Sequence, residues 1–190
     1  MTSVYEATDR VKELVADAPA QALTEALRIE PPIARIYALA WIIRYARVGV
    51  VREAVREAQA TARACPDAYC RAVALAGPIR AALERGESGS ARRMLDVALS
   101  HLPAMTTTSE QAETLRQLFD AVLPGDHEIW SLLVGQLVDR CPAHRHWRAA
   151  RAHLRAVAAL KARDRSLAET LVNALAPGPT ERRARRLLER

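Results

Sequence analysis

The sequence predicts an all-α protein built from about five antiparallel helical hairpins. Hydrophobic residues make up 50% of the chain but aromatic residues only 4%, so the core must consist mainly of Ala, Leu, Val and Ile. Ala and Leu favour helices, and few β-branched runs lie between turn residues. The heptapeptide ALAWIIR, which begins at Ala38, recurs 36 residues later in the related form ALAGPIR, which begins at Ala74. A repeated helical unit explains both the composition and this recurrence.

Glycine and proline residues mark the turns of these units. Three glycines are each followed by a proline 17 residues later, and the pairs are Gly49 with Pro66, Gly86 with Pro103, and Gly125 with Pro142. A glycine that ends one helix in the left-handed conformation, and a proline that ends the next, produce this pattern. Each unit is therefore expected to run helix, glycine turn, helix, proline turn.

These turns define the expected elements in order. The hairpins are predicted at residues 2–31, 33–65, 67–103, 108–141 and 143–176, within a single domain of residues 1–190. The first hairpin ends at Pro31-Pro32, and the next three follow the glycine and proline pattern. In the fifth, Arg163-Asp164 stands where glycine is expected, and the sequence APGPT ends the unit.

A terminal helix is expected at residues 180–190. Thr180 is a suitable N-cap, and Ala184, Leu187 and Leu188 share one helical face that would cover the last hairpin. The five arginines expected to face water are Arg182, Arg183, Arg185, Arg186 and Arg190.

Gly77-Pro78 interrupts the first helix of the third hairpin. Proline in a helix interior removes a hydrogen bond and costs about 3 kcal/mol. The helix is therefore expected either to kink there or to begin again at Pro78. Such a break is interpreted as tolerated architecture, and the alternative is a kink that widens a groove beside Arg80 and Glu84.

The turn pattern resembles that of tetratricopeptide repeats, which are stacked helical hairpins of usually 34 residues. The hairpin at 67–103 matches the family's second-helix signature, at Gly86, Ala91, Leu95, Ala98 and Pro103. The first-helix signature is missing, and the turn positions recur every 37 to 39 residues, so a HEAT-like repeat is the alternative. The resemblance implies a right-handed α-solenoid of 10–11 helices, with a concave face formed by the first helix of each hairpin.

The resemblance also implies a binding groove on that concave face. The groove residues it indicates are Leu39, Ile43, Arg47, Arg80, Glu84, Leu115, Phe119, His153 and Val157. An apolar exposed patch of this kind is typical of an interaction site. The expected function is that of a non-enzymatic adaptor that binds a peptide or a partner's helix, and self-association is an alternative. A shift in register would instead place these residues in the core.

Positive charge is concentrated at the C-terminal end. Residues 140–190 hold 13 basic and four acidic residues, whereas residues 1–139 hold 15 basic and 18 acidic residues. A basic patch of Arg182, Arg183, Arg185 and Arg186 therefore suggests nucleic-acid binding as the alternative function. The other interpretation is a solvated face of the terminal helix.

The sequence lacks three common catalytic motifs, and a pocket built from dispersed residues is the remaining route to an enzyme. It has no Gly-x-Ser-x-Gly elbow, no glycine-rich phosphate loop and no His-Glu-x-x-His. Cys141, His144 and His146 suggest a zinc site, but Cys65-Pro66 and Cys141-Pro142 occupy equivalent places in two units. The cysteines are therefore interpreted as structural, and no metal or cofactor is expected.

The N-terminal sequence and the apolar segments favour a cytoplasmic protein. Residues 1–10 include acidic residues and lack the apolar stretch of a signal peptide. The most apolar stretch, residues 36–43, is too short to span a bilayer. No membrane partner is expected.

Overall fold

A computed structural model describes residues 4–189, and these residues form helices and loops with no β-strand. Their contacts group the chain into two compact units, residues 1–102 and 103–190. The all-α fold predicted from the sequence is therefore confirmed for the described residues. The arrangement of all the hairpins in one array stays a prediction.

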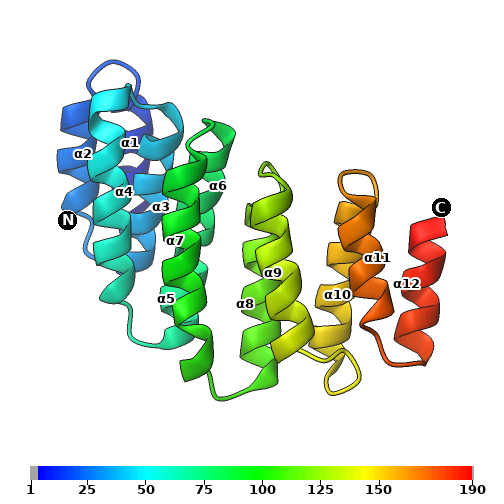
Figure 1. Ribbon diagram of the computed structural model, residues 1–190. Coiled ribbons are helices and arrows are strands. Elements are labelled where there is room, and N and C mark those ends of the chain that lie inside the picture. Colours follow the sequence, from blue (N-terminus) through cyan, green and yellow to red (C-terminus); the bar gives the residue numbers. More distant parts are fainter. Residues whose placement is uncertain (1–3, 190) are drawn as a thin grey trace. The chain divides into compact units, whose positions relative to one another are not determined.

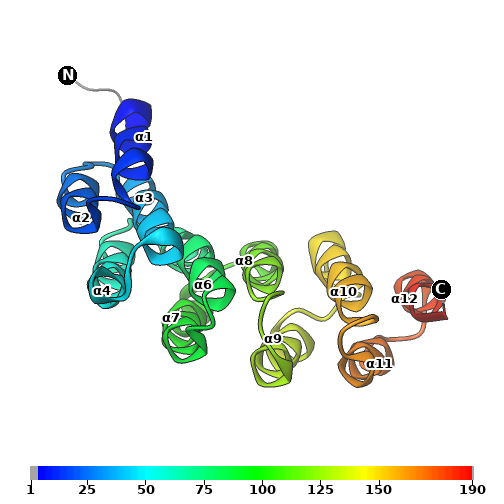
Figure 2. The same ribbon diagram turned by 90° about the horizontal axis from the view of Figure 1, so that it is seen from above.

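The first unit contains seven α-helices in its described part. They are α1 (Val4–Leu14), α2 (Pro19–Leu27), α3 (Pro32–Tyr45), α4 (Val48–Arg63), α5 (Ala68–Ala74), α6 (Ala76–Glu84) and α7 (Ser88–Ser100). Within this unit α1, α3 and α6 lie in one row and α2, α4 and α7 in a second row (Figures 1 and 2). The core between the rows is aliphatic and includes Leu39, Ile43, Val55 and Leu95, all buried.

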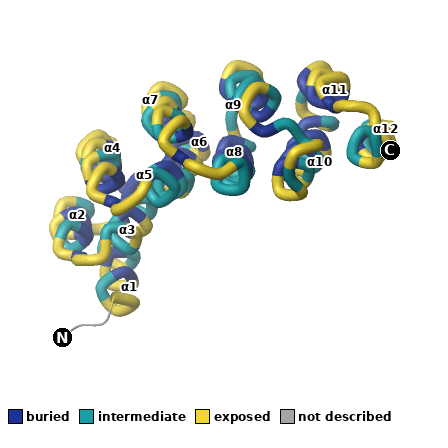
Figure 3. The backbone as a smooth tube through the Cα atoms, turned by 90° about the horizontal axis from the view of Figure 1, so that it is seen from below, coloured by how far each residue is buried: buried dark blue, intermediate teal, exposed yellow. Residues whose placement is uncertain are grey.

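The second unit has the same two-row arrangement. Its helices are α8 (Thr108–Ala121), α9 (His127–Arg140), α10 (Trp147–Leu160), α11 (Arg165–Asn173) and α12 (Pro179–Glu189), and a short 3₁₀ turn, η1 (Leu102–Ala104), precedes them. Within the unit α8, α10 and α12 form one row and α9 and α11 the other (Figure 2). Buried residues lie mainly on the sides of the helices that face their neighbours (Figure 3).

One side-chain contact recurs at the start of three hairpins. The fourth residue of α3, α5 and α8 reaches back to the carbonyl oxygen of the residue six positions earlier. The pairs are Arg35 Nε to Ile29 at 2.8 Å, Arg71 Nε to Cys65 at 2.8 Å, and Gln111 Nε2 to Met105 at 3.3 Å. Each accepting residue is buried and lies just after the preceding helical segment. Each back-reaching contact links the start of a hairpin to the short segment that leads into it.

Only one of the three glycines expected to end a helix in the left-handed conformation does so. Gly86 has a φ of 78°, and among the described glycines no other has a positive φ. Gly49 instead lies inside the first turn of α4. The end of α3 does not need a left-handed glycine, because the Arg85 guanidinium donates to the carbonyls of Arg44 and Ala46 at 3.2 and 2.7 Å.

The break at Gly77-Pro78 is a restart of the helix. α5 ends at Ala74 and α6 begins at Ala76, so Pro78 lies in the first turn of α6. Backbone N–H groups in a first turn have no partner within the helix, and the missing N–H of proline therefore costs little there. The restart occurs two residues earlier than the sequence suggested.

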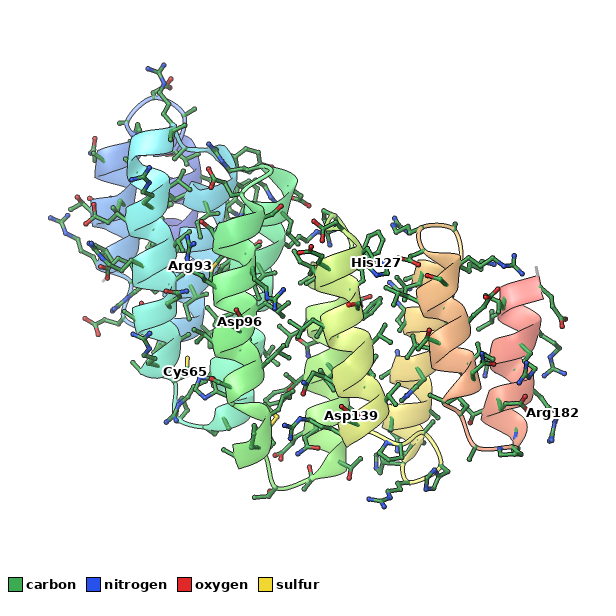
Figure 4. The ribbon with its side chains drawn as sticks, viewed as in Figure 1. Cys65, Arg93, Asp96, His127, Asp139 and Arg182 are labelled. Atoms are coloured by element: carbon green, nitrogen blue, oxygen red, sulfur yellow. The ribbon has the colours of Figure 1, made fainter. Side chains whose placement is uncertain are left out.

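Side-chain caps fix the starts of α8, α9, α10 and α11 in the second unit. Thr107 and Glu110 form a reciprocal capping box at α8, and Asp164 accepts from the backbone N–H of Leu167 at 3.1 Å. Asp164 also lies 2.5 Å from His127 Nδ1 at the start of α9 (Figure 4). These hydrogen bonds lower the pKa of Asp164 to about 2, with the His127 contact as the largest cause. The capped ends of α9 and α11 are thereby joined.

The terminal helix is present and begins one residue before its predicted start. α12 starts at Pro179, so Thr180 lies within the first turn and is not the N-cap. Proline is favoured as the first helical residue because its φ is already suitable for a helix. Ala184 is fully buried, and Leu187 and Leu188 are half-buried against α10 and α11. Arg190 lies outside the described residues.

None of the helices between residues 4 and 189 combines the length and the apolar character needed to cross a membrane.

Candidate functional site

Most of the predicted groove residues lie in the cores of the two units. Six of the nine are at most 2% exposed, and these are Leu39, Ile43, Leu115, Phe119, His153 and Val157. The expectation that they line an open groove is therefore wrong. Their burial agrees with the alternative interpretation, in which a shift in register places these residues in the core.

His153 is a buried imidazole in the core of the second unit. Its Nδ1 lies 3.0 Å from the carbonyl oxygen of Ala149, and its side chain is 2% exposed. Burial lowers the pKa of His153 below its ordinary value of 6.5, because the imidazolium would lose its hydration. The role of this residue is therefore in core packing.

The low pKa of His153 predicts a loss of stability in mild acid. In the unfolded chain the His153 imidazole takes up a proton near pH 6.5, whereas in the folded protein it does so only at a lower pH. The free energy of unfolding therefore keeps its full value above pH 6.5 and decreases as the pH falls below 6.5. The loss should be at most about 1.4 kcal/mol per pH unit. We expect His153→Leu to show a flatter dependence between pH 7.5 and 5 in urea titrations. An identical slope in both proteins would contradict the assignment.

The three remaining predicted residues are exposed on the first unit. Arg80 and Glu84 lie on α6, and Glu84 accepts from Arg80 Nε at 2.9 Å and from Arg44 Nη2 of α3 at 2.6 Å. Arg47 lies in the turn between α3 and α4. Two predicted residues, Arg80 and Glu84, thus lie together at the junction of α3 and α6.

An exposed stripe of large apolar side chains runs along α3 beside this ion-pair cluster. Ile33, Tyr37, Trp41 and Tyr45 are spaced four residues apart, which places them on one side of the helix. Ile33, Tyr37 and Tyr45 are each more than 50% exposed, and Tyr5 of α1 is 84% exposed. We call these five residues the aromatic face.

The aromatic face is hollowed at two places. A depression of about 530 Å³ between α1 and α3 is lined by residues that include Tyr5, Ile33 and Tyr37. A smaller one of about 110 Å³ lies between α3 and α6, beside Tyr37, Trp41 and Arg80. Tyr37 lines both depressions, so the two form a continuous surface over the first-row helices of this unit.

Cations and ring stacking hold the aromatic side chains in place. The rings of Trp41 and Tyr45 stack with centroids 5.1 Å apart, and Lys12 Nζ lies 5.4 Å from the Trp41 ring. A hydrogen bond from Lys12 to Asp9 raises the pKa of this lysine, which favours its charged form. Cation–π contacts of this kind hold the ring while leaving part of it open.

The sequence contained a signal for this surface that the groove prediction did not use. The stretch from residue 33 to 45 is apolar on all sides of the helix, so hydrophobicity alone does not distinguish the buried side from the exposed side. The aromatic residues at 37, 41 and 45 follow the four-residue spacing, whereas the buried residues include Leu39 and Ile43. In a chain with only eight aromatic residues, three at this spacing were the informative feature.

The predicted basic patch is exposed, but one of its four arginines is ion-paired and another lines a depression. Arg185 is paired with Glu181 within α12. Arg183 lines a depression between α12 and α10. Arg182 and Arg186 are exposed, and Figure 4 shows Arg182 at the outer edge of α12.

The residues suggested as zinc ligands, Cys141, His144 and His146, differ in how far they are buried. Cys141 is fully buried at the end of α9, and burial raises the pKa of its thiol to about 11. His144 is exposed. Within residues 4–189, no cluster of three or more His, Cys, Asp or Glu side chains is arranged to hold a metal ion.

Comparisons with known proteins return no match, whether with protein-family models, with curated proteins or with solved structures.

Proposed function

We propose that this protein is a tetratricopeptide-like helical-repeat adaptor that binds a helix or an extended segment of another protein on the aromatic face. The repeat interpretation is supported by the hairpins in two rows within each unit and by the back-reaching contacts of Arg35, Arg71 and Gln111. In the proposed arrangement the hairpins form a right-handed α-solenoid, and the function is non-enzymatic.

The observation that carries the proposal is the gathering of aromatic residues on one exposed surface. Four of the eight aromatic residues, namely Tyr5, Tyr37, Trp41 and Tyr45, belong to the aromatic face. Tyr and Trp are enriched at protein interfaces because they bury a large area with little loss of rotamer freedom. A stable monomer seldom exposes such a patch unless it serves binding.

The charges beside the aromatic face indicate the character of the bound segment. Lys12 and Arg80 border its two depressions, but Lys12 is paired with Asp9, and Arg80 shares Glu84 with Arg44. A segment with apolar anchors on its bound side and polar residues on the opposite side complements this arrangement. An amphipathic helix meets that requirement, with anchors at positions i, i+4 and i+7.

A paired substitution tests the proposal. Tyr37→Glu/Tyr45→Glu places two charges on the aromatic face, and because both side chains are half exposed the fold should be kept. We expect this variant to lose the partners that the wild type captures in quantitative affinity purification from its native cells, with at least a tenfold drop in recovery. An equal recovery by a variant with an unchanged melting curve would contradict the proposal.

The matched control adds the same charge elsewhere on the unit. Gln21→Glu/Ala60→Glu alters exposed residues of α2 and α4, in the second row. We expect it to recover partners like the wild type. Light scattering on all three proteins identifies self-association, because a dimer that dissociates only in Tyr37→Glu/Tyr45→Glu would make the partner a second copy of this chain.

A further inference from the structure

A second surface lies in the other unit, between α10 and α12, and does not depend on the aromatic face. Two depressions of about 610 and 510 Å³ adjoin there and share Trp147, Ala150, Pro179 and Thr180. The first continues along α10 past Arg151 and Arg155 and along α12 past Arg183. We call this surface the Trp147 groove.

The Trp147 groove carries positive charge that residues 4–189 do not fully neutralise. Arg145, Arg151 and Arg183 line it and make no ion pair with a described residue. Arg155 differs, because its Nε donates to Asp120 at 2.9 Å. Among the described residues that line the two depressions, none is acidic. An anionic occupant is therefore complementary to the groove.

Trp147 adds a flat apolar surface to this charge. Its side chain is 62% exposed, whereas Trp130 in the same unit is buried and donates its indole N–H to the carbonyl of Val122. Arg148 lies 5.2 Å from the Trp147 ring and His146 stacks against it at 5.9 Å. These neighbours restrict the ring while a large part of it stays open to the groove.

We infer that the Trp147 groove binds single-stranded nucleic acid. Grooves of this class combine arginines that follow the phosphates with an aromatic ring on which a base stacks. Trp147, Arg151 and Arg155 lie four residues apart on α10 and so extend along about 12 Å of one helix side. Arg183 faces them from α12. A single aromatic ring can stack on any base and does not discriminate between bases. Binding is therefore sequence-tolerant and sensitive to salt.

A charge-matched pair of variants tests the role of the groove. Fluorescence anisotropy with a labelled oligothymidylate of about 12 nucleotides, within the site size of such grooves, measures the affinity. We expect Arg151→Gln/Arg183→Gln to weaken binding at least tenfold. It should also reduce the slope of log affinity against log salt by about 1.4, for two phosphate contacts on a single strand. Arg182→Gln/Arg186→Gln removes the same charge from outside the groove and should change the affinity less than about threefold.

Trp147→Leu separates stacking from charge. It keeps every arginine and should lower the affinity about 5- to 100-fold, which corresponds to the loss of one base–aromatic stack. The unlabelled oligonucleotide should quench tryptophan fluorescence in the wild type and leave this variant unquenched. Thermal melts of all variants verify that the exposed substitutions leave the fold intact.

Each alternative outcome overturns the inference. It fails if the wild type does not bind at low salt, if both arginine pairs weaken binding equally, or if Trp147→Leu binds like the wild type. It also fails if polyglutamate of similar length competes as well as the oligonucleotide, because an acidic peptide is then the better occupant. Tyr37→Glu/Tyr45→Glu should bind the oligonucleotide normally, so this result is independent of the proposed adaptor function.

Discussion

Leu39→Glu is expected to unfold the first unit, whereas Tyr37→Glu, two residues earlier on the same helix, is expected to leave it folded. Leu39 has no exposed surface, and Tyr37 is 55% exposed. An unpaired carboxylate in an aliphatic core costs several kcal/mol, and about 2 kcal/mol of apolar burial is lost as well. That sum approaches the whole stability of a typical domain. The exposed substitution should change stability by less than about 1 kcal/mol.

Circular dichroism during thermal and urea unfolding measures this difference. Leu39→Glu should lose a large part of its helical signal at 25 °C, and Tyr37→Glu should melt close to the wild type. Similar curves for the two variants would show that Leu39 does not lie in the core. The same reasoning applies to Phe119, which is 1% exposed. Neither position is therefore suitable for a test of binding, because the fold would be lost first.

Removal of residues 179–190 should destabilise the second unit by about 2–4 kcal/mol. The deletion takes away α12, whose fully buried Ala184 and half-buried Leu187 and Leu188 cover α10 and α11. It exposes apolar surface on those two helices to water. Urea unfolding of the truncated and full-length proteins measures the loss.

The control for this deletion keeps the helix and removes charge from it. Arg182→Gln/Arg186→Gln changes only exposed side chains and should stay within about 0.5 kcal/mol of the wild type. A truncated protein as stable as the full chain would show that α12 does not act as a cap. A large loss in the Gln variant would show that these arginines contribute to the fold.

The hairpin boundaries were predictable because prolines, glycines and capping residues act locally. Pro31 is the N-cap of α3 and Pro32 its first residue, and Asp164 caps α11 at the turn where glycine was missing. The glycine caps were less predictable, because Arg85 reaches the end of α3 from about 40 residues away in the sequence. A contact of that range leaves no local pattern.

The binding surfaces were harder to predict than the helices. On α3 both sides are apolar, so the choice of buried side depends on contacts with α1, α4 and α6 that a linear pattern does not contain. The excess of C-terminal arginines was visible, but pairing between distant residues was not. Arg155 pairs with Asp120, 35 residues away, while Arg151 is open beside Trp147. Folding brought Trp147 and Arg183 together from 36 residues apart.

The back-reaching contacts have a consequence for how a chain of this kind changes length. Arg35 and Arg71 occupy the same place in successive hairpins, and each lies six residues after its acceptor, Ile29 or Cys65. Excision of residues 35–70 would bring Arg71 to the sixth position after Ile29, so the junction would regain the same contact. Duplication of that segment would add another such junction. Evolution can therefore insert or delete a whole hairpin here without requiring a new way to join it to its neighbour.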